Sequence, residues 1–534
     1  MKHTALILAF ATLSHPLLAA DNIQLQQEIK LLQQQTKMLQ TQLDKLQKQL
    51  VGQDNKQRSR KSKKPVSAKS KSAQKKTVPS RPPASSRAHS YHTSVIAVHT
   101  PLESASATGF YPTALIADNN RIITYIAGTP VITTPYLGER PAFDGSDYIV
   151  NISSINRDIR LMQQRRKLYD AYEKIGYPIP NRPIISLSGK SEPVASLTRP
   201  YAGQSQGDFG LGSSEVDVAA ALNEYVEAFI GIAFDDSPPS AGGPRINNSS
   251  FDLNLGFVNI GNLDETPIYF TAGQLYAPFG RYSSSMISSP ITLGLARTKT
   301  RPFILGYKSQ SEPGPYAAVY GFIPDTTLGR SAVGGVNAGY IISSGDISGD
   351  IGAGLIGSID DSQGMQGTGS APFTTFGGFG SITNGSEAVG KVPAVDFHAN
   401  VSFDRYSLTA EWVGTSRAFN PEDLSVNGRG AKPQALQLEG AVTFIAFNKP
   451  SSLAAGYQWS KDTLALNLPK RRISGVFNIS IWKDTVESLE YRHDVDFSTG
   501  TFANGAPAPG QVNLNTIGTG KSADTLIAQL GVYF

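Results

Sequence analysis

The sequence has 534 residues, no cysteine, 51 glycines, 24 phenylalanines and 21 tyrosines, and its formal net charge is +5 at pH 7. Without cysteine, disulfides and thiolate metal sites are excluded. The positive charge comes from one stretch, because residues 56–87 carry twelve Lys or Arg and no acid, whereas residues 88–534 hold 31 basic and 39 acidic residues. The main body is therefore acidic, and its charge does not indicate a nucleic-acid partner.

Residues 1–20 have the pattern of a secretory signal peptide. Lys2 precedes an apolar run at 5–13, and Ala19 and Ala20 offer a small-residue cleavage site. No later run reaches the roughly 18 apolar residues of a transmembrane helix. The sequence therefore predicts export without a helical anchor.

Residues 21–51 are predicted to form a coiled coil. Apolar residues recur at spacings of four and three, with Thr36 the one polar exception: Leu25, Ile29, Leu32, Leu39, Leu43, Leu46 and Leu50. An apolar stripe this narrow favours self-association of the helix. The pattern is compatible with a homotrimer and with a dimer. The alternative is a single helix docked on the rest of the chain.

A linker is predicted at 52–100, where Lys, Ser, Pro and Ala dominate. Its basic part, 56–87, is interpreted as an extended spacer or as a contact with anionic cell-wall material. Residues 101–183 form a pre-barrel segment with one amphipathic helix at 152–176, which has a basic face. This segment is a plug at the barrel mouth or a periplasmic cap.

From residue 184 to 534 the chain alternates between apolar and polar residues in segments of about ten, which is the signature of an outer-membrane barrel. Sixteen strands are predicted, at 184–197, 208–222, 225–235, 250–258, 267–278, 297–308, 315–325, 332–342, 347–358, 393–403, 406–416, 433–446, 451–461, 470–482, 485–495 and 522–534. The predicted fold class is thus an all-β transmembrane barrel of about 16 antiparallel strands, with an N-terminal α-helical coiled coil and one pre-barrel helix.

The face assignments follow from the alternation within single strands. Apolar side chains at Phe251, Leu253, Leu255 and Phe257 are predicted to face lipid together. The connections alternate between short and long, which places the short turns and both chain ends in the periplasm. The last strand is predicted to close the barrel against 184–197, through Leu526, Leu530, Val532 and Phe534.

Sixteen strands leave a lumen wide enough for solute, so the ligand candidates are charged residues that face it. On the strands these are Asp396, His398, Glu411, Glu439, Arg472, Glu490 and Arg492, together with Glu215, Asp217 and Asp494. A basic ladder near the outer mouth is predicted from Arg297, Lys299 and Arg301, which would attract carboxylates or phosphates. The alternative is that these three face the phosphates of lipopolysaccharide.

No enzyme, cofactor or metal site is predicted. The barrel segment contains only two histidines, His398 and His493, on strands that are not neighbours, and no Ser/Asp arrangement is expected to converge on them.

Three segments carry a family resemblance: TPYLG at 134–138, AFDGSDYIVNISSINRDIRLMQQ at 142–164 and LSGK at 187–190. With the layout of signal, coiled coil, barrel and terminal aromatic residue, they resemble the LbtU-type siderophore porin family. A weaker similarity joins GQLYAPFG at 273–280 to the loop-three entry of phosphate- and dicarboxylate-type porins. The first resemblance implies an outer-membrane barrel that takes up an iron–siderophore.

Three functions follow as hypotheses. The first is a porin-like receptor for a ferric siderophore, with no transducer-coupled plug, because the chain before residue 184 is too short for one. The second is a general or anion-preferring diffusion porin for small anionic solutes. The third is an envelope tether that acts through the coiled coil and the basic linker. All three place the chain among outer-membrane lipid and lipopolysaccharide.

Overall fold

The computed structural model describes four short strands between residues 96 and 133, and then 155–174, 183–235, 250–324, 331–345, 347–367, 390–421, 423–482, 484–503 and 517–534. The predicted signal peptide, coiled coil and basic stretch 56–87 lie outside these ranges, as do the resemblance segment at 134–138 and most of that at 142–164. None of the helices in the described ranges is long and apolar enough to cross a membrane.

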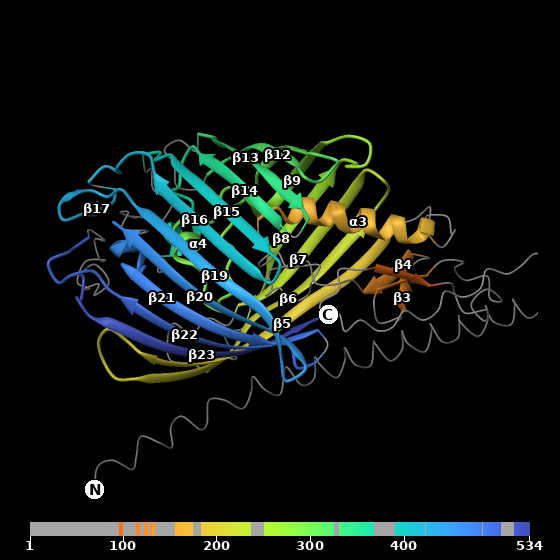
Figure 1. Ribbon diagram of the computed structural model, residues 1–534. Coiled ribbons are helices and arrows are strands. Elements are labelled where there is room, and N and C mark those ends of the chain that lie inside the picture. Colours follow the sequence, from red (N-terminus) through yellow and green to blue (C-terminus); the bar gives the residue numbers. More distant parts are fainter. Residues whose placement is uncertain are drawn as a thin grey trace, which may run out of the picture. The chain divides into compact units, whose positions relative to one another are not determined.

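A closed antiparallel barrel of sixteen strands dominates the fold (Figure 1). Its strands are β5 (Ile184–Arg199), β6 (Gln206–Ala221), β7 (Val226–Asp235), β8 (Ser250–Ile260), β9 (Ile268–Tyr276), β11 (Phe303–Lys308), β12 (Gly314–Phe322), β13 (Val333–Ser344), β14 (Ile347–Ile356), β15 (Ala394–Phe403), β16 (Tyr406–Thr415), β19 (Gln434–Ala446), β20 (Lys449–Lys461), β21 (Arg471–Ile479), β22 (Thr485–Val495) and β23 (Ser522–Tyr533). The prediction of an all-β barrel with this number of strands is confirmed.

Smaller elements accompany the barrel. They are the strands β1 (Ile96–His99), β2 (Ala114–Ala117), β3 (Ile122–Ile126), β4 (Thr129–Thr133), β10 (Lys299–Thr300), β17 (Ser425–Val426) and β18 (Arg429–Gly430), the helices α3 (Arg157–Lys174), α4 (Ile291–Ala296) and α5 (Gln363–Gly367), and the 3₁₀ helix η3 (Leu464–Leu466). β1, which pairs with β2, falls at the end of the region predicted to be a structureless linker. α3 lies within the helix predicted at 152–176.

The barrel is apolar outside and polar inside. On β15, Phe397 and Phe403 are exposed on the outer face, whereas Asp396 and His398 are buried on the inner face. β19 repeats this pattern, with Leu438 exposed outside and Gln437 and Glu439 buried inside. This inverts the distribution in a soluble protein, because the lipid core of a membrane accepts the apolar face.

The two ends of the barrel differ in their connections. At one end, here called the turn end, no connection exceeds the seven residues 261–267, and three connections, 345–346, 404–405 and 447–448, have only two residues. At the other, the loop end, the connections include 277–302, 357–393 and 496–521. The predicted alternation of short and long connections is therefore present.

One face assignment was wrong, on β8. Phe251 and Leu253 are exposed outside, but Leu255 and Phe257 are buried inside. The pairing with β7 skips one β8 residue between Leu253 and Leu255, which is a β-bulge. An extra residue reverses the in–out alternation, so the apolar pair beyond the bulge faces inward.

The predicted basic strand at 297–308 is also wrong in its first half. Arg297 follows helix α4, only Lys299 and Thr300 pair with β9, and the strand β11 begins at Phe303. Pro302 has no N–H to donate to a sheet, which explains the interruption before β11.

The barrel closes between β23 and β5, as predicted. Leu526 pairs with Leu197, and Leu526 and Leu530 are exposed on the outer face. Val532 pairs with Ser191, and Phe534 exchanges backbone hydrogen bonds with Gly189. Beyond Phe534 the start of β5 would have a free edge, and β4 covers it in parallel, with Val131 opposite Ile185. The sequence analysis did not predict this edge strand.

The closure depends on the absence of a side chain at Gly189. A Cβ atom there would lie 2.8 Å from the Phe534 ring and 2.8 Å from the Glu215 backbone oxygen. We expect Gly189→Val to push Phe534 out of register and so to weaken the barrel. The folded, heat-modifiable band on a gel should melt at a lower temperature than in the wild type, whereas Gly440→Val, where a Cβ meets nothing within 4 Å, should not shift it. Equal melting of the two variants would contradict this.

Candidate functional site

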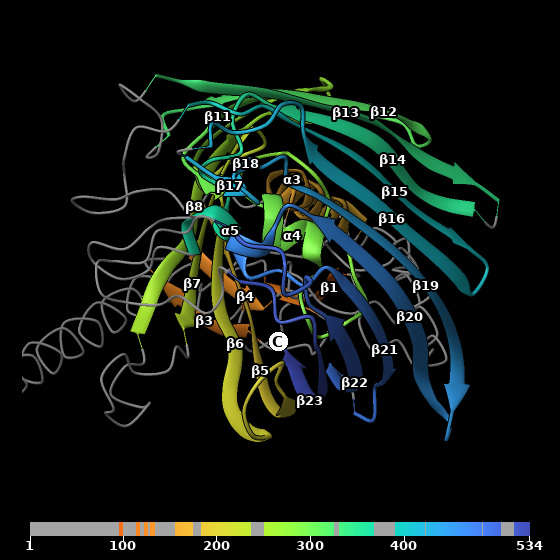
Figure 2. The ribbon, with the colours of Figure 1, turned by 90° about the vertical axis from the view of Figure 1, so that its left-hand side faces the viewer.

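The candidate site is the lumen, which two segments narrow. Residues 277–298, here called the inner loop, leave β9 and include α4. Their contacts lie on the inner faces of β14, β16 and β19–β22. Helix α3 contacts the inner faces of β6–β9. Figure 2 shows α3 and α4 enclosed by the ring of strands.

Two carboxylates on the barrel wall anchor the middle of the inner loop. Glu411 on β16 accepts the backbone N–H of Arg281 at 2.6 Å and of Tyr282 at 3.0 Å, and the Thr292 hydroxyl at 2.8 Å. Glu439 on β19 accepts the Ser285 N–H at 2.6 Å and the Ser284 hydroxyl at 2.8 Å. Both carboxylates are buried. They satisfy loop backbone that would otherwise be buried without partners.

The rest of the inner loop is held in the same way. Glu490 on β22 accepts the N–H of Ser288 at 2.8 Å and also bonds its hydroxyl. Gln458 on β20 accepts the Ile291 N–H at 2.7 Å, and Gln437 donates to the Ser283 carbonyl at 2.8 Å. Glu411, Glu439 and Glu490, predicted as ligand candidates, thus all bind the protein's own loop.

Arg281 fixes the inner loop to β14. Its guanidinium lies 2.7 Å from the Asp350 carboxylate and 5.0 Å from the centre of the Tyr316 ring. Burial opposes the charge of Arg281, but the Asp350 carboxylate outweighs that effect and raises the pKa of the guanidinium above its ordinary value. The inner loop therefore keeps a charged anchor.

The predicted candidates Asp396 and His398 belong to the same buried network. His398 Nδ1 lies 2.6 Å from Asp396 Oδ1, and its Nε2 lies 3.0 Å from the Tyr316 hydroxyl. His493 pairs with Asp524 at 2.7 Å. Each of these histidines therefore has an aspartate partner, which the sequence analysis did not predict. In the described ranges no group of three or more His, Asp or Glu residues is placed to hold a metal ion.

Two arginines on the barrel wall, Arg472 and Arg492, share one acid, Asp494, next to the inner loop. Arg472 binds Asp494 through two nitrogens, at 2.7 and 3.2 Å, and donates to the Ser289 carbonyl of the loop at 2.9 Å. Arg492 lies 3.1 Å from the same Asp494, and its side chain stays 23% exposed. These three groups carry a net positive charge. We call them the arginine pair site.

Helix α3 is fixed to the opposite wall through its arginines. Arg157, which is 4% exposed, lies 2.8 Å from Glu215 and 3.3 Å from Asp217 on β6. Arg165 lies 3.6 Å from Glu227 on β7. The basic face predicted for this helix is thus partly buried against acids.

The same helix ends near the turns. Arg166 pairs with Asp264, which lies in the connection 261–267, so α3 runs toward the turn end. Near its start, Asp158 accepts the Thr271 hydroxyl at 3.2 Å, and burial raises the pKa of its carboxyl. Ile155 and Leu161 pack in the same apolar cluster as Leu255 and Phe257. The bulge that turned those β8 residues inward therefore provides an apolar contact for α3.

The predicted basic ladder is dispersed. Arg297 stacks over Tyr276, with 4.6 Å from its guanidinium carbon to the ring centre, and donates to Gln363 of α5. Lys299 donates to Asn254, which in turn donates to Glu215, the partner of Arg157. Arg301 lies in the two-residue break between β10 and β11 and donates to Gln274. The three cations therefore have separate partners and form no single row on one strand.

Sequence reasoning missed the inner loop as the main partner of the wall. The signal was present, because residues 283–285 are three serines and Ser288 and Ser289 follow, and short hydroxyl side chains suit a loop that hydrogen-bonds to carboxylates. Asp350 and Tyr316 were also missed, since neither stands out in its strand.

The chain resembles known proteins in sequence and in fold. No protein-family model matches it. In solved structures, it is similar to the outer membrane channel DcaP of Acinetobacter baumannii, with a TM-score of 0.41, 12% identity, and coverage of 67% of this chain and 99% of that one. An anion-selective porin from Comamonas acidovorans gives a TM-score of 0.42 at 12% identity, with coverage of 66% and 100%.

The sequence relatives are much closer. A UPF0422 protein of Legionella pneumophila strain Paris is 62% identical over 536 residues, which cover 100% of both chains. A UPF0422 protein of Coxiella burnetii is 34% identical over 406 residues, which cover 75% of this chain and 83% of that one. At this identity and coverage, the chain belongs to the UPF0422 protein family.

Proposed function

We propose that this protein is an outer-membrane channel that admits small anionic solutes by diffusion through a narrowed lumen. The observation that carries the proposal is the arginine pair site, where Arg472 and Arg492 share the single carboxylate of Asp494. Glu490 also acts on Arg492, but its oxygens already accept from Ser288 of the inner loop. Arg492, whose side chain stays partly exposed, presents its positive charge on the inner wall and so attracts anions into the lumen.

The finer proposal is that the solute is a ferric siderophore whose chelator carries carboxylates. Guanidinium groups recognise carboxylates in a planar, two-bond geometry, which suits Arg492 with its partly exposed side chain. The chelator already fills the iron's coordination sphere, so no protein ligand to the metal is needed. The resemblance to LbtU-type siderophore porins supports this substrate class. The loop end then faces outside and the turn end faces the periplasm.

Ion selectivity tests the channel. We expect the purified barrel in a planar bilayer to pass chloride in preference to potassium, and Arg492→Gln to shift the permeability ratio toward cations by roughly fivefold, since one charge near a narrow path is worth about 1 kcal/mol. Arg471→Gln is the matched control, because Arg471 neighbours Arg472 on the same strand but is exposed and faces outward. An identical reversal potential in wild type and Arg492→Gln would contradict an anion path at this site.

Iron-limited growth tests the substrate. A deletion strain supplied with a ferric polycarboxylate chelate should grow more slowly than the wild type, and the intact gene should restore growth while the Arg492→Gln gene restores it only partly. Normal uptake of the chelate by the deletion strain would remove the siderophore proposal and leave the anion channel, the second hypothesis, in place.

A further inference from the structure

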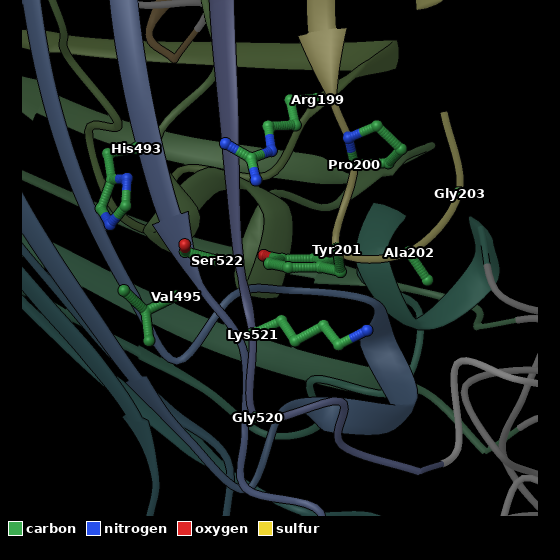
Figure 3. Close-up of a pocket in the computed structure, with 10 residues that line it drawn as sticks. All are labelled: Arg199, Pro200, Tyr201, Ala202, Gly203, His493, Val495, Gly520, Lys521 and Ser522. Carbon is green, nitrogen blue, oxygen red and sulfur yellow. The ribbon is translucent and has the colours of Figure 1, made fainter. Parts of the chain in front are cut away.

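A cavity of about 730 Å³ lies where the barrel closes, at the loop end of β5, β22 and β23. It is lined by Arg199, Pro200, Tyr201, Ala202, Gly203, His493, Val495, Gly520, Lys521 and Ser522. Figure 3 shows the Arg199 guanidinium and the Tyr201 and Ser522 hydroxyls turned toward one another, with the His493 ring at the side. Neither the channel nor its inner loop uses these residues.

Part of the cavity's lining lies on the outer face of the barrel. In the strand register, Arg199 on β5 and His493 on β22 both lie opposite Asp524 on β23. Asp524 is two residues before Leu526, so these three residues lie on the same face of the sheet as Leu526. That face is the lipid-facing one, because Leu197 is 64% exposed and Leu526 is 42% exposed. The inward neighbours on the same strands, Arg492 and Asp494, do not line the cavity.

The lining is suited to an anion. Arg199 and Lys521 carry positive charge, and no acid is among the residues that line the cavity. Asp524 lies beside it, where it accepts from the Tyr491 hydroxyl at 2.8 Å and lies 2.7 Å from His493 Nδ1, and Asp494 and Asp496 act on Tyr201. Burial and the Asp494 carboxylate raise the pKa of Tyr201, so its hydroxyl keeps its proton and can donate. The lining itself therefore carries a net positive charge.

The outer face below the cavity is apolar. Leu197, Leu489 and Leu526 lie on adjacent strands toward the turn end and are all exposed. We propose that the cavity binds the phosphate-bearing headgroup of a membrane lipid, whose acyl chains then lie along this leucine surface. Free inorganic phosphate shares the headgroup chemistry, but it would leave the leucine surface unused. The ligand is therefore assigned to the membrane.

Lipid binding to the full-length protein tests the proposal. The purified barrel in neutral detergent is titrated with diacyl phosphatidic acid, with phosphatidylcholine of the same chains, or with inorganic phosphate, and bound lipid is counted by native mass spectrometry. We expect phosphatidic acid to bind, Arg199→Gln/Lys521→Gln to weaken it on the order of tenfold, and millimolar phosphate not to displace it, since each basic side chain at a membrane surface contributes about 1 kcal/mol.

The matched control is Lys461→Gln, an exposed cation on the outer face of β20 at the same end of the barrel, which should bind as the wild type does. Lys521→Gln alone, in the connection before β23, gives a second measurement should the double variant lose the heat-modifiable folded band. Equal binding by wild type and Lys521→Gln, equal binding of phosphatidylcholine, or displacement by inorganic phosphate would each overturn the proposal.

Discussion

Replacing Glu411 and Glu439 together by alanine will release the inner loop and change the single-channel conductance from steady to fluctuating. Glu411 alone satisfies two loop N–H groups and one hydroxyl, and Glu439 satisfies one of each. A buried donor left without its acceptor costs about 1–3 kcal/mol. With five loop donors left without an acceptor, the docked position of the loop is destabilised by several times that amount.

The measurement is single-channel conductance, with limited trypsin digestion as the structural readout. In the double variant we expect a larger, flickering conductance and cleavage after Arg281, whose side chain is only 13% exposed in the docked loop. Glu411→Gln and Glu439→Gln keep an acceptor oxygen at each position and should retain most of the wild-type behaviour.

The matched control is Glu487→Ala. Glu487 also accepts a backbone N–H, that of Ile481 at 2.9 Å, but at the turn end and outside the inner loop. If the double variant conducts and resists trypsin as this control does, the wall glutamates do not hold the loop, and their role as ligand candidates returns.

Strand positions were predictable here because each strand alternates on its own. The bounds of β22, predicted at 485–495, are those observed, and β15 and β16 differ by one residue at one end. Alternation is a local property, set by which face meets lipid. The face of Leu255 was not predictable, since it depends on a bulge that only the pairing with β7 defines.

The role of the lumen residues could be predicted only in part. That Glu411 and Glu490 face inward follows from their strands, and the structure agrees. What the two glutamates bind does not follow from their strands, because their partners, Tyr282 and Ser288, are 129 and 202 residues away in the sequence. From the sequence alone, acids that face the lumen are therefore interpreted as ligands for a solute. Only the structure shows that the inner loop lies beside them and binds them.

Arg157→Ala will free helix α3 from the barrel wall and raise the conductance of the channel. Its guanidinium is buried between Glu215 and Asp217 on β6, and removing one partner of a buried ion pair costs about 3–5 kcal/mol, since the remaining charges are left uncompensated. A change of this size shifts the ratio of docked to undocked helix by more than about 100-fold. We therefore expect a larger stepwise conductance in planar bilayers.

Arg166→Ala is the control on the same helix. Its ion pair with Asp264 has side chains that are 49% and 47% exposed, and such surface pairs contribute about 0–1 kcal/mol, so its conductance should match the wild type. Arg157→Met combined with Glu215→Gln and Asp217→Asn removes the cation and both anions together. Because this variant leaves no buried charge without a partner, it should return toward wild-type conductance. An Arg157→Ala channel that conducts like Arg166→Ala would show that α3 does not restrict the path, and the helix would then be a cap at the turn end.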